Sequence, residues 1–473
     1  MDANDGNSSH DGVTESERIL VRLCRSSFLT PWSFANPFVS EGRGSGKGQG
    51  KELTDVLVVF GDDVLLFSDK NPTFHIGAPV GVAWARWFQN AIWKSALQLK
   101  GAMGSIDRDP VNIYADALCT RRITAIIPKR EKRRYHLIAV TRGSSDACRY
   151  HFLSKRGTYI ISSGLRGRGQ HLKIPFRIGH IFDDGPFLHV FDEFSLDFVM
   201  GHFDTAVDFL CYLKDRESMF RDGTVQFTAD GEEELASGYL LNRAYGRTGF
   251  LPTFEGEAPP DFVTFPEGLY EELTEKTEYL LKRNADEFSR GFDKLIEHFA
   301  KSGEVAELES AESGTVASHE ESLRVLASED RFGRRQIYTA LVGLVVATDR
   351  EQESGRIRVV YCEQRPDRAY VLGVVSRKTN ESDTAYRARR QRMLLDYCAC
   401  VQLRFPKATT VVGICIDKAE SAGSKYEDLV VYYPPPLTPS SWVELELFRK
   451  SLGILSDTTE AQSITVTEYP RRS

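Results

Sequence analysis

The sequence predicts a multidomain protein of mixed α/β and α+β class, and three observations lead to this prediction. The chain has 473 residues, which is more than one domain usually holds. Short runs of β-branched residues and leucine alternate with longer stretches that carry apolar residues at helical spacing. With 41% hydrophobic and 27% charged residues, the composition is typical of globular proteins.

Four segments are expected along the chain. Residues 14–127 are predicted to form a first α/β domain, and residues 128–250 an α+β domain whose charge changes from basic to acidic. Residues 251–318 contain prolines, a long amphipathic helix predicted over 267–300, and a polar linker. Residues 319–473 are predicted to form a second α/β domain.

The most informative pattern lies at the start of the first domain. Two apolar runs, residues 53–60 and 64–67, flank the turn sequence Gly-Asp-Asp, so a β-hairpin is predicted. Asp55 lies near the entry of the first strand and Lys70 at the exit of the second. The hairpin therefore brings both residues to one end, together with Glu52 and Asp69.

This collection of side chains suits the hydrolysis of a phosphodiester bond. Carboxylates hold a hard divalent cation, which positions a water molecule and offsets the charge of the transition state. Glu52, Asp55 and Asp69 are the predicted metal ligands, and Lys70 would orient the attacking water or stabilise developing charge. The expected cofactor is Mg²⁺ or Mn²⁺.

Asp55, the hairpin and the ending Ser68-Asp69-Lys70 resemble the PD-(D/E)XK nuclease superfamily, in particular its restriction-endonuclease-like and nuclease-related branches. The next helix is similar too, because Lys94 and Gln98 share one face, where such cores place a lysine or glutamine toward the metal. The resemblance covers residues 14–127 and implies a metal-dependent endonuclease with these residues in its active site. It also allows a role in restriction or phage defence.

The sequence departs from the family pattern at one position. The family's last motif is acid-x-lysine, which places both side chains on one face of the strand, but here the acid position is Ser68. Asp69 comes one residue late and is expected on the opposite face unless the strand is bulged. A second interpretation therefore stays open: a catalytically inactive nuclease-like module that binds nucleic acid or a partner protein.

The net charge of the chain is −7, but basic residues are concentrated in one stretch. Residues 121–177 contain fifteen Lys or Arg against Glu131 and Asp146, as expected of a surface that binds a phosphate backbone. DNA is the first expected partner and RNA the second, while a solvated basic loop is the alternative. The predicted nucleic-acid-binding residues are Arg121, Arg122, Lys129, Arg130, Lys132, Arg133, Arg134, Arg166 and Arg168.

The last segment repeats the order of the first. A helix beginning near residue 320 precedes a hairpin over 356–375, then a helix over 385–404 and a strand over 410–416. The second hairpin ends in Ser376-Arg377-Lys378, so a divergent second copy of the nuclease-like fold is predicted. Catalysis is not expected there, because no acid corresponds to Asp55.

Further expectations concern single elements and cellular location. Strands are predicted over 110–115, where one completes the first sheet, over 123–127, and over 187–199. The ten histidines are dispersed, and His189 and His202 are expected to have core or surface roles. The polar, acidic first 18 residues are unlike a secretory signal or a transit peptide, and no apolar run approaches the roughly 20 residues of a membrane span. A cytoplasmic protein without a membrane partner is expected, whereas protein partners and oligomeric state stay open.

Overall fold

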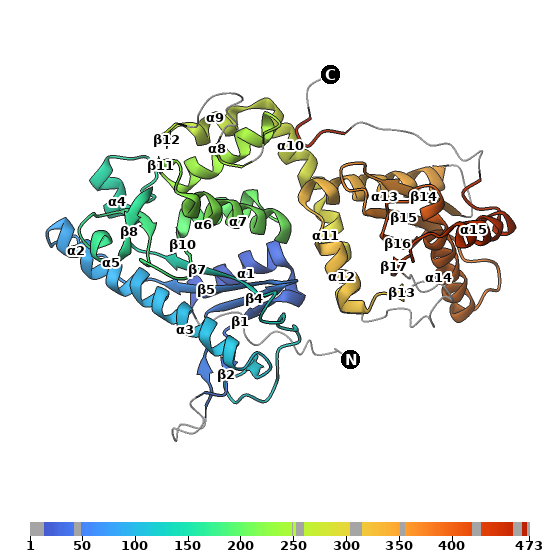
Figure 1. Ribbon diagram of the computed structural model, residues 1–473, viewed down its shortest axis with the longest axis horizontal. Helices are drawn as coiled ribbons and strands as arrows, with labels where there is room; N and C mark the ends of the chain where they lie inside the picture. The colour runs from blue at the N-terminus through green and yellow to red at the C-terminus, as the bar shows by residue number, and fades with distance from the viewer. Residues whose placement is uncertain are drawn as a thin grey trace. The chain divides into compact units, whose positions relative to one another are not determined.

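The computed structural model describes residues 14–41, 49–247, 249–251, 260–302, 315–350, 355–418, 427–456 and 466–470. Contacts divide the chain into two compact units, Met1–Lys282 with Glu468–Ser473 and Arg283–Thr467. Each unit combines helices with β-sheet (Figure 1), which confirms the predicted mixed α/β, multidomain class at this level.

A five-stranded sheet forms the centre of the first unit. Its strands, in order across the sheet, are β1 (Ser33–Ala35), β4 (Val56–Phe60), β5 (Asp63–Lys70), β7 (Arg134–Thr141) and β10 (Leu188–Asp192). β4 is antiparallel to β1 and β5, whereas β5, β7 and β10 run parallel. Because β5 and β7 are neighbours, this sheet takes strands from both sides of the boundary that the sequence places at residue 127.

The predicted hairpin is present as β4 and β5. Val56 pairs with Phe67 and Phe60 with Asp63 across the turn. Every residue of β4 is buried, and in β5 only Lys70 is not. Strands that are apolar on both faces must be covered by helices on both faces, and this is the arrangement found.

Helices cover the two faces of this sheet. The amphipathic helix α1 (Glu15–Phe28) is capped by Thr14, which forms a capping box with Glu17, and packs on β4 and β5. The helix predicted after the hairpin runs through α2 (Val80–Phe88), a wide π-turn (Gln89–Trp93) and α3 (Lys94–Arg108), which packs on β5 and β7. In Figure 1, α3 lies below the sheet, whereas α6 (Glu193–His202) and α7 (Ala206–Asp222) lie above it.

Two smaller sheets complete the first unit. One consists of β12 (Phe262–Phe265), β11 (Gln226–Ala229), β8 (Ile160–Arg166) and β9 (Arg177–His180), with helices α4 (Ser145–Phe152), α5 (Gly167–His171), α8 (Glu232–Ala244) and α9 (Leu269–Glu275) in the same unit. The other consists of β3 (Lys51–Glu52), β2 (Phe38–Val39) and β6 (Ile113–Tyr114). The prediction that residues 110–115 complete the first sheet is therefore wrong, because β6 pairs with β2.

Two other predicted strands differ from the structure. Residues 187–199 are a strand only as far as Asp192, whose side chain accepts the N–H groups of Phe194 and Ser195 and so begins helix α6. The cap starts a helix at this position, and the alternation of apolar and polar residues that predicted a strand is too weak to prevent it. Residues 123–127 form no strand, so this prediction is wrong. The β-bridge between Tyr114 and Arg122 ends just before them.

The second unit has its own five-stranded sheet. The order is β13 (Thr315–Val316), β17 (Glu427–Tyr433), β16 (Thr410–Asp417), β15 (Arg368–Val375) and β14 (Gly355–Tyr361). The predicted sequence of hairpin, helix and strand is present as β14, β15, α14 (Asp383–Cys400) and β16, with β15 parallel to β16.

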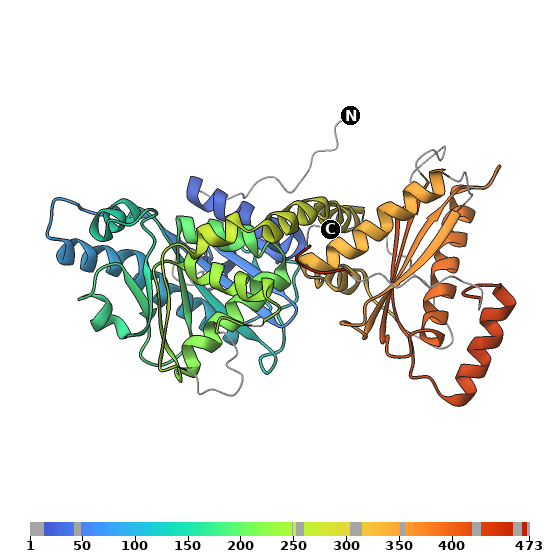
Figure 2. The same ribbon diagram turned by 90° about the horizontal axis from the view of Figure 1, so that it is seen from above.

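The faces of this sheet are covered by different helices. Alternate residues Ala369, Val371 and Val375 pack in one core with Tyr386 and Leu394 of α14. The intervening side of β15 faces α13 (Arg331–Arg350), so α13 and α14 lie on opposite faces, as Figure 2 shows for the two long orange helices. The unit also contains α11 (Arg290–Ser302), α12 (His319–Ala327) and α15 (Pro439–Leu452).

Two long predicted helices are interrupted. The helix predicted over 267–300 consists of α9, α10 (Thr277–Phe288) and α11, with breaks at Lys276 and Ser289. The helix predicted from residue 320 is divided into α12 and α13 around Glu329, whose side chain is occupied by contacts to β15 and its preceding turn. No helix in the described residues is both long and apolar enough to cross a membrane.

Candidate functional site at the open end of the first hairpin

Asp55 and Lys70 meet at the end of the hairpin that lies away from its turn. Lys70 Nζ is 3.8 Å from Asp55 Oδ2, and the two side chains are 33% and 6% exposed. The main chain holds this geometry, because Asp55 N–H donates to Phe67 O (3.0 Å) and Thr54 Oγ1 donates to the same oxygen (2.5 Å). The hairpin thus presents one amine to solvent beside one buried carboxylate.

The environment of Asp55 disfavours its charged form. Burial raises the pKa of the Asp55 carboxyl to about 6, although Lys70 and the N–H group of Asp69 lower it. That N–H donates to Asp55 Oδ2 at 2.5 Å, and the nearby carboxylates of Glu52 and Glu17 add to the upward shift. A divalent cation would supply positive charge beside this buried carboxylate and favour its charged form, so the carboxyl is suited to hold one.

Ser68, in the position of the family's acid, turns toward helix α3. Its hydroxyl lies 3.1 Å from Ser95 Oγ and 3.3 Å from Gln98 Oε1. Gln98, predicted to support the site, is thus brought to the strand beside Lys70. Lys94, one turn earlier in α3, is exposed.

Asp69 points to the opposite face of β5. Its carboxylate accepts hydrogen bonds from Arg142 Nε at 3.2 and 3.3 Å, and its side chain is fully buried. Burial raises the pKa of Asp69, whereas Arg142 and Ser16 lower it. The alternation of a regular strand explains this placement, as expected for an unbulged β5.

Glu52 lies in β3, a short exposed strand that leads into Asp55. Its Oε1 accepts a hydrogen bond from Asn36 Nδ2 at 3.2 Å. Glu52, Asp55 and Asp69 do not form a group whose ligand atoms all lie within 4.8 Å, although all three belong to the described residues. The predicted metal ligands are therefore one buried carboxylate, one exposed neighbour and one acid held by Arg142.

All of the predicted nucleic-acid-binding residues except Arg133 are exposed, and five of the nine also have side-chain contacts within the protein. Arg121, Lys129, Arg130 and Lys132 are exposed. The Arg133 side chain is 3% exposed and donates to Pro128 O and Asp107 Oδ1. Further contacts join Arg134 to Asp63, Arg122 to Asn112, Arg166 to Asp183 O, and Arg168 to Gln89.

The basic loop over 128–133 lies at the turn end of the hairpin, because Arg134 N–H donates to Asp62 O at 2.8 Å. Lys70 pairs with Thr141 at the far end of β7. Seven residue steps of about 3.3 Å separate the two ends by roughly 23 Å. Arg122, unlike the basic loop, is connected to the strand that leads into Asp55. It forms a β-bridge with Tyr114 of the small sheet that contains β3.

Two residues at the site were missed by sequence reasoning. Arg142 follows β7 directly, and Ser95 is a small polar residue on the buried face of α3. Arg142 could be found only by knowing that β7 runs parallel to β5, which brings the ends of both strands to one edge.

Comparisons with known proteins give no further assignment. No protein-family model, no curated protein and no solved structure matches the chain.

Proposed function

We propose that the first unit contains a PD-(D/E)XK nuclease-like core. Its order of helix α1, hairpin β4–β5 and helix α2–α3 is the order that the sequence resemblance implies, and the next strand of the sheet is β7, parallel to β5, in place of the strand expected at 110–115. Asp55 at the entry of β4 and Lys70 at the exit of β5 occupy the positions of the family's acid and lysine. This agreement of element order and residue position supports the proposal.

The function that this geometry supports best is metal-dependent hydrolysis of phosphodiester bonds in DNA, with RNA as the second substrate. The observation that carries it is the 3.8 Å separation of Lys70 Nζ and Asp55 Oδ2 at one accessible edge. Asp55 would bind Mg²⁺ or Mn²⁺, which in proteins is often held by one or two carboxylates and several waters. Lys70 would stabilise the developing negative charge.

The supporting residues differ in how well they fit this role. Glu52 is the nearer second carboxylate, since its charge acts on Asp55. Gln98 fixes Ser68 on the face that Lys70 shares. Asp69 would act indirectly, because its N–H group orients the Asp55 carboxylate while its side chain bonds Arg142.

A second function, binding of nucleic acid or a partner protein without catalysis, is favoured by one specific observation. The acid expected on the lysine's face is Ser68, and the adjacent Asp69 is neutralised by Arg142 on the other face. A site with one buried carboxylate holds a divalent cation less tightly than a site with two. The two functions can be distinguished by whether cleaved nucleic acid is formed.

The decisive experiment incubates the purified chain with plasmid, single-stranded DNA and RNA in the presence of Mg²⁺ or Mn²⁺. Cleavage is expected for the native chain, with a loss of at least about 100-fold for Asp55→Ala and Lys70→Ala. Asp62→Asn, at the opposite end of the hairpin, is the matched control and should cleave normally. Cleavage that persists in both site variants contradicts the assignment, whereas salt-sensitive binding without cleavage supports the inactive module.

A further inference from the structure

Three metal-ligating side chains come together at the turn end of the first hairpin, away from Asp55 and Lys70. His136 lies on β7, His189 on β10 and Glu217 on α7, and one ligand atom of each lies within 4.8 Å of the others. Among the described residues, no other trio of histidine, cysteine or carboxylate side chains meets this spacing. The sheet explains the pairing: His189 is opposite Ile138, so His136 and His189 leave the same face.

Both histidines carry a buried nitrogen that has no protein partner. His136 is 3% exposed and His189 is fully buried. Within the described part of the chain, His136 Nδ1 and His189 Nε2 have no hydrogen-bond partner. Two unsatisfied nitrogens in one buried place carry a cost in free energy that a bound ligand would remove.

The outer side of each histidine is already engaged. His136 Nε2 lies 2.9 Å from Asp63 Oδ1, and carboxylates hold ligating histidines in this way in metal sites. His189 Nδ1 lies 3.5 Å from Arg216 Nη1, the outer limit of a hydrogen bond. Arg216 is held more firmly by Glu232, at 2.7 and 2.8 Å, so this weak contact is easily given up.

The charges around the trio are paired. Lys214 and Arg134 bind Asp63, and Arg221 Nε donates to Glu217 at 2.6 Å. Glu217, whose side chain is 24% exposed, provides the access to solvent.

We propose that His136, His189 and Glu217 bind a divalent transition-metal ion, with Zn²⁺ as the expected species. Two imidazoles and one carboxylate are a common ligand set for zinc, and they leave a fourth position for water. Mg²⁺ prefers oxygen ligands only, so this site differs in chemistry from the one proposed at Asp55. Glu217 is partly exposed, so its side chain would be the one that moves to close on the ion at the usual distance of about 2.1 Å.

The test is calorimetric titration of the full-length chain with Zn²⁺, paired with thermal unfolding in the presence and absence of the ion. The native chain is expected to bind about one Zn²⁺ and to gain thermal stability from it, and an excess of Mg²⁺ should not displace this ion, because Mg²⁺ prefers oxygen ligands. His136→Gln, His189→Gln and Glu217→Gln should each weaken Zn²⁺ binding by at least about 100-fold, and Asp63→Asn by about 10- to 100-fold.

Matched controls separate this site from other sources of zinc affinity. His171 is equally buried, but both of its nitrogens are bonded, to Gly167 O and Gly179 N–H, so His171→Gln should keep native zinc binding. Cys211→Ser, which removes an exposed thiol, and Asp55→Ala, which removes the proposed nuclease carboxylate, should keep it too.

Three results overturn the proposal. They are the absence of Zn²⁺ binding in the native chain, equal binding by the native chain and Glu217→Gln, and a loss in His171→Gln as large as that in His189→Gln. If the buried histidine variants do not fold, Glu217→Gln decides, because its partly exposed side chain can be exchanged without disturbing the core. If Asp55→Ala binds zinc as the native chain does, the zinc site does not depend on the proposed nuclease site, whatever the result of the cleavage assay.

Discussion

The two units build comparable hairpins but differ in how they compensate buried carboxylates at the hairpin's open end. In the first unit, Asp55 faces the ammonium of Lys70, which is one-third exposed and 3.8 Å away. In the second unit, Asp417, opposite Val375 at the same end of β15, is bound by the fully buried Arg390. Arg390 Nε also lies 2.7 Å from Asp428 Oδ2.

This difference separates a site from a structural cluster. Arg390 brings a buried positive charge to two acids and leaves no position for a cation from solution. Lys378, which corresponds to Lys70 in the order of elements, is exposed. Incomplete compensation at Asp55, by contrast, leaves a carboxyl with a raised pKa beside solvent, which is typical of functional groups.

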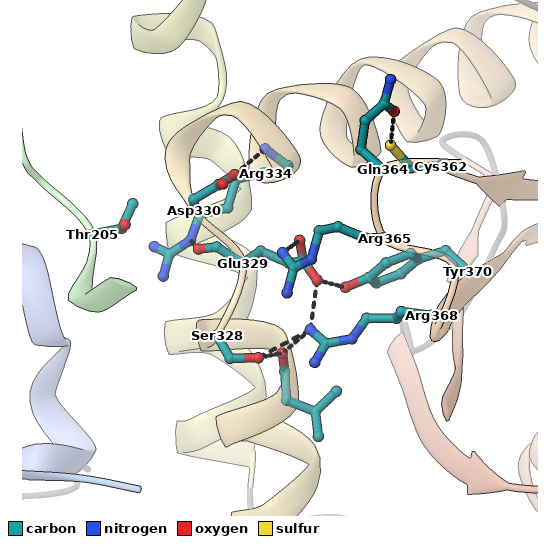
Figure 3. A network of polar contacts seen from close by, with 12 residues as sticks. Thr205, Ser328, Glu329, Asp330, Arg334, Cys362, Gln364, Arg365, Arg368 and Tyr370 are labelled. Atoms are coloured by element: carbon teal, nitrogen blue, oxygen red, sulfur yellow. Dashed lines mark hydrogen bonds and ion pairs between the residues drawn. The ribbon is translucent and has the colours of Figure 1, made fainter. Parts of the chain in front are cut away.

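The turn ends of the hairpins also differ. In the second unit, Glu329 accepts hydrogen bonds from Arg365 (2.5 Å), Arg368 (2.5 Å) and Tyr370 (2.6 Å), as Figure 3 shows, and this joins the break between α12 and α13 to the hairpin. In the first unit, Asp63 holds a histidine as well as two cations. Within the described residues, the turn of the first hairpin thus combines an acid with an imidazole, whereas Glu329 at the turn of the second hairpin is bound by two arginines and a tyrosine.

The largest expected effect comes from breaking the buried cluster of the second unit. Arg390→Met removes the buried positive charge that binds Asp417 and Asp428 and should cost about 3–5 kcal/mol of unfolding free energy. Arg392→Ala, on the same helix with an exposed side chain paired to Asp396, should cost less than about 1 kcal/mol. Urea unfolding followed by circular dichroism measures both, and equal losses would contradict the structural role of Arg390.

A smaller effect, with a clear dependence on pH, is expected at Asp55. Its folded pKa of about 6 exceeds the ordinary value of 3.8, so the folded state holds the proton more tightly. The contribution of Asp55 to stability should therefore become less favourable as pH rises from about 4 to above 6, by up to about 3 kcal/mol. Asp55→Asn, which cannot ionise, should be more stable than the native chain above about pH 7 and lose this advantage near pH 4.

Thermal unfolding over this pH range measures the difference between native chain and variant. A constant difference across the range would show that Asp55 does not titrate with a raised pKa. The ionisation of Asp55 also predicts how cleavage depends on pH. If ionised Asp55 is a metal ligand, the cleavage rate should increase as pH rises through about 6.

The smallest effect is expected from the lysines. Lys70 lowers the pKa of Asp55, so Lys70→Met should shift the pH midpoint of the stability change upward, by less than about one unit because Lys70 is partly exposed. Lys378→Met, at the corresponding exposed position of the second unit, should leave the pH profile unchanged. A shift of equal size in both variants would remove the distinction between the two hairpin ends.

Much of the local structure could be predicted from residue patterns. The capping box at Thr14, the Gly-Asp-Asp turn and the spacing of apolar residues in α2 and α3 are local signals, and each forms the expected element. Predictions were wrong where a local pattern was weak and a side chain decided, as at Asp192, which begins a helix. The break at Glu329 likewise depends on partners about forty residues away.

The sequence by itself determined the two hairpins, their flanking helices and the meeting of Asp55 with Lys70, because a tight turn fixes which strand ends meet. The tertiary structure decided which charges are compensated, since Arg142, Arg390 and Glu329 find their partners through parallel strands and packed helices distant in sequence. It also brought His136, His189 and Glu217 together from two strands and a helix. Such contacts depend on how β7 and β10 pair and on where α7 packs against them. No local pattern in the chain encodes this placement.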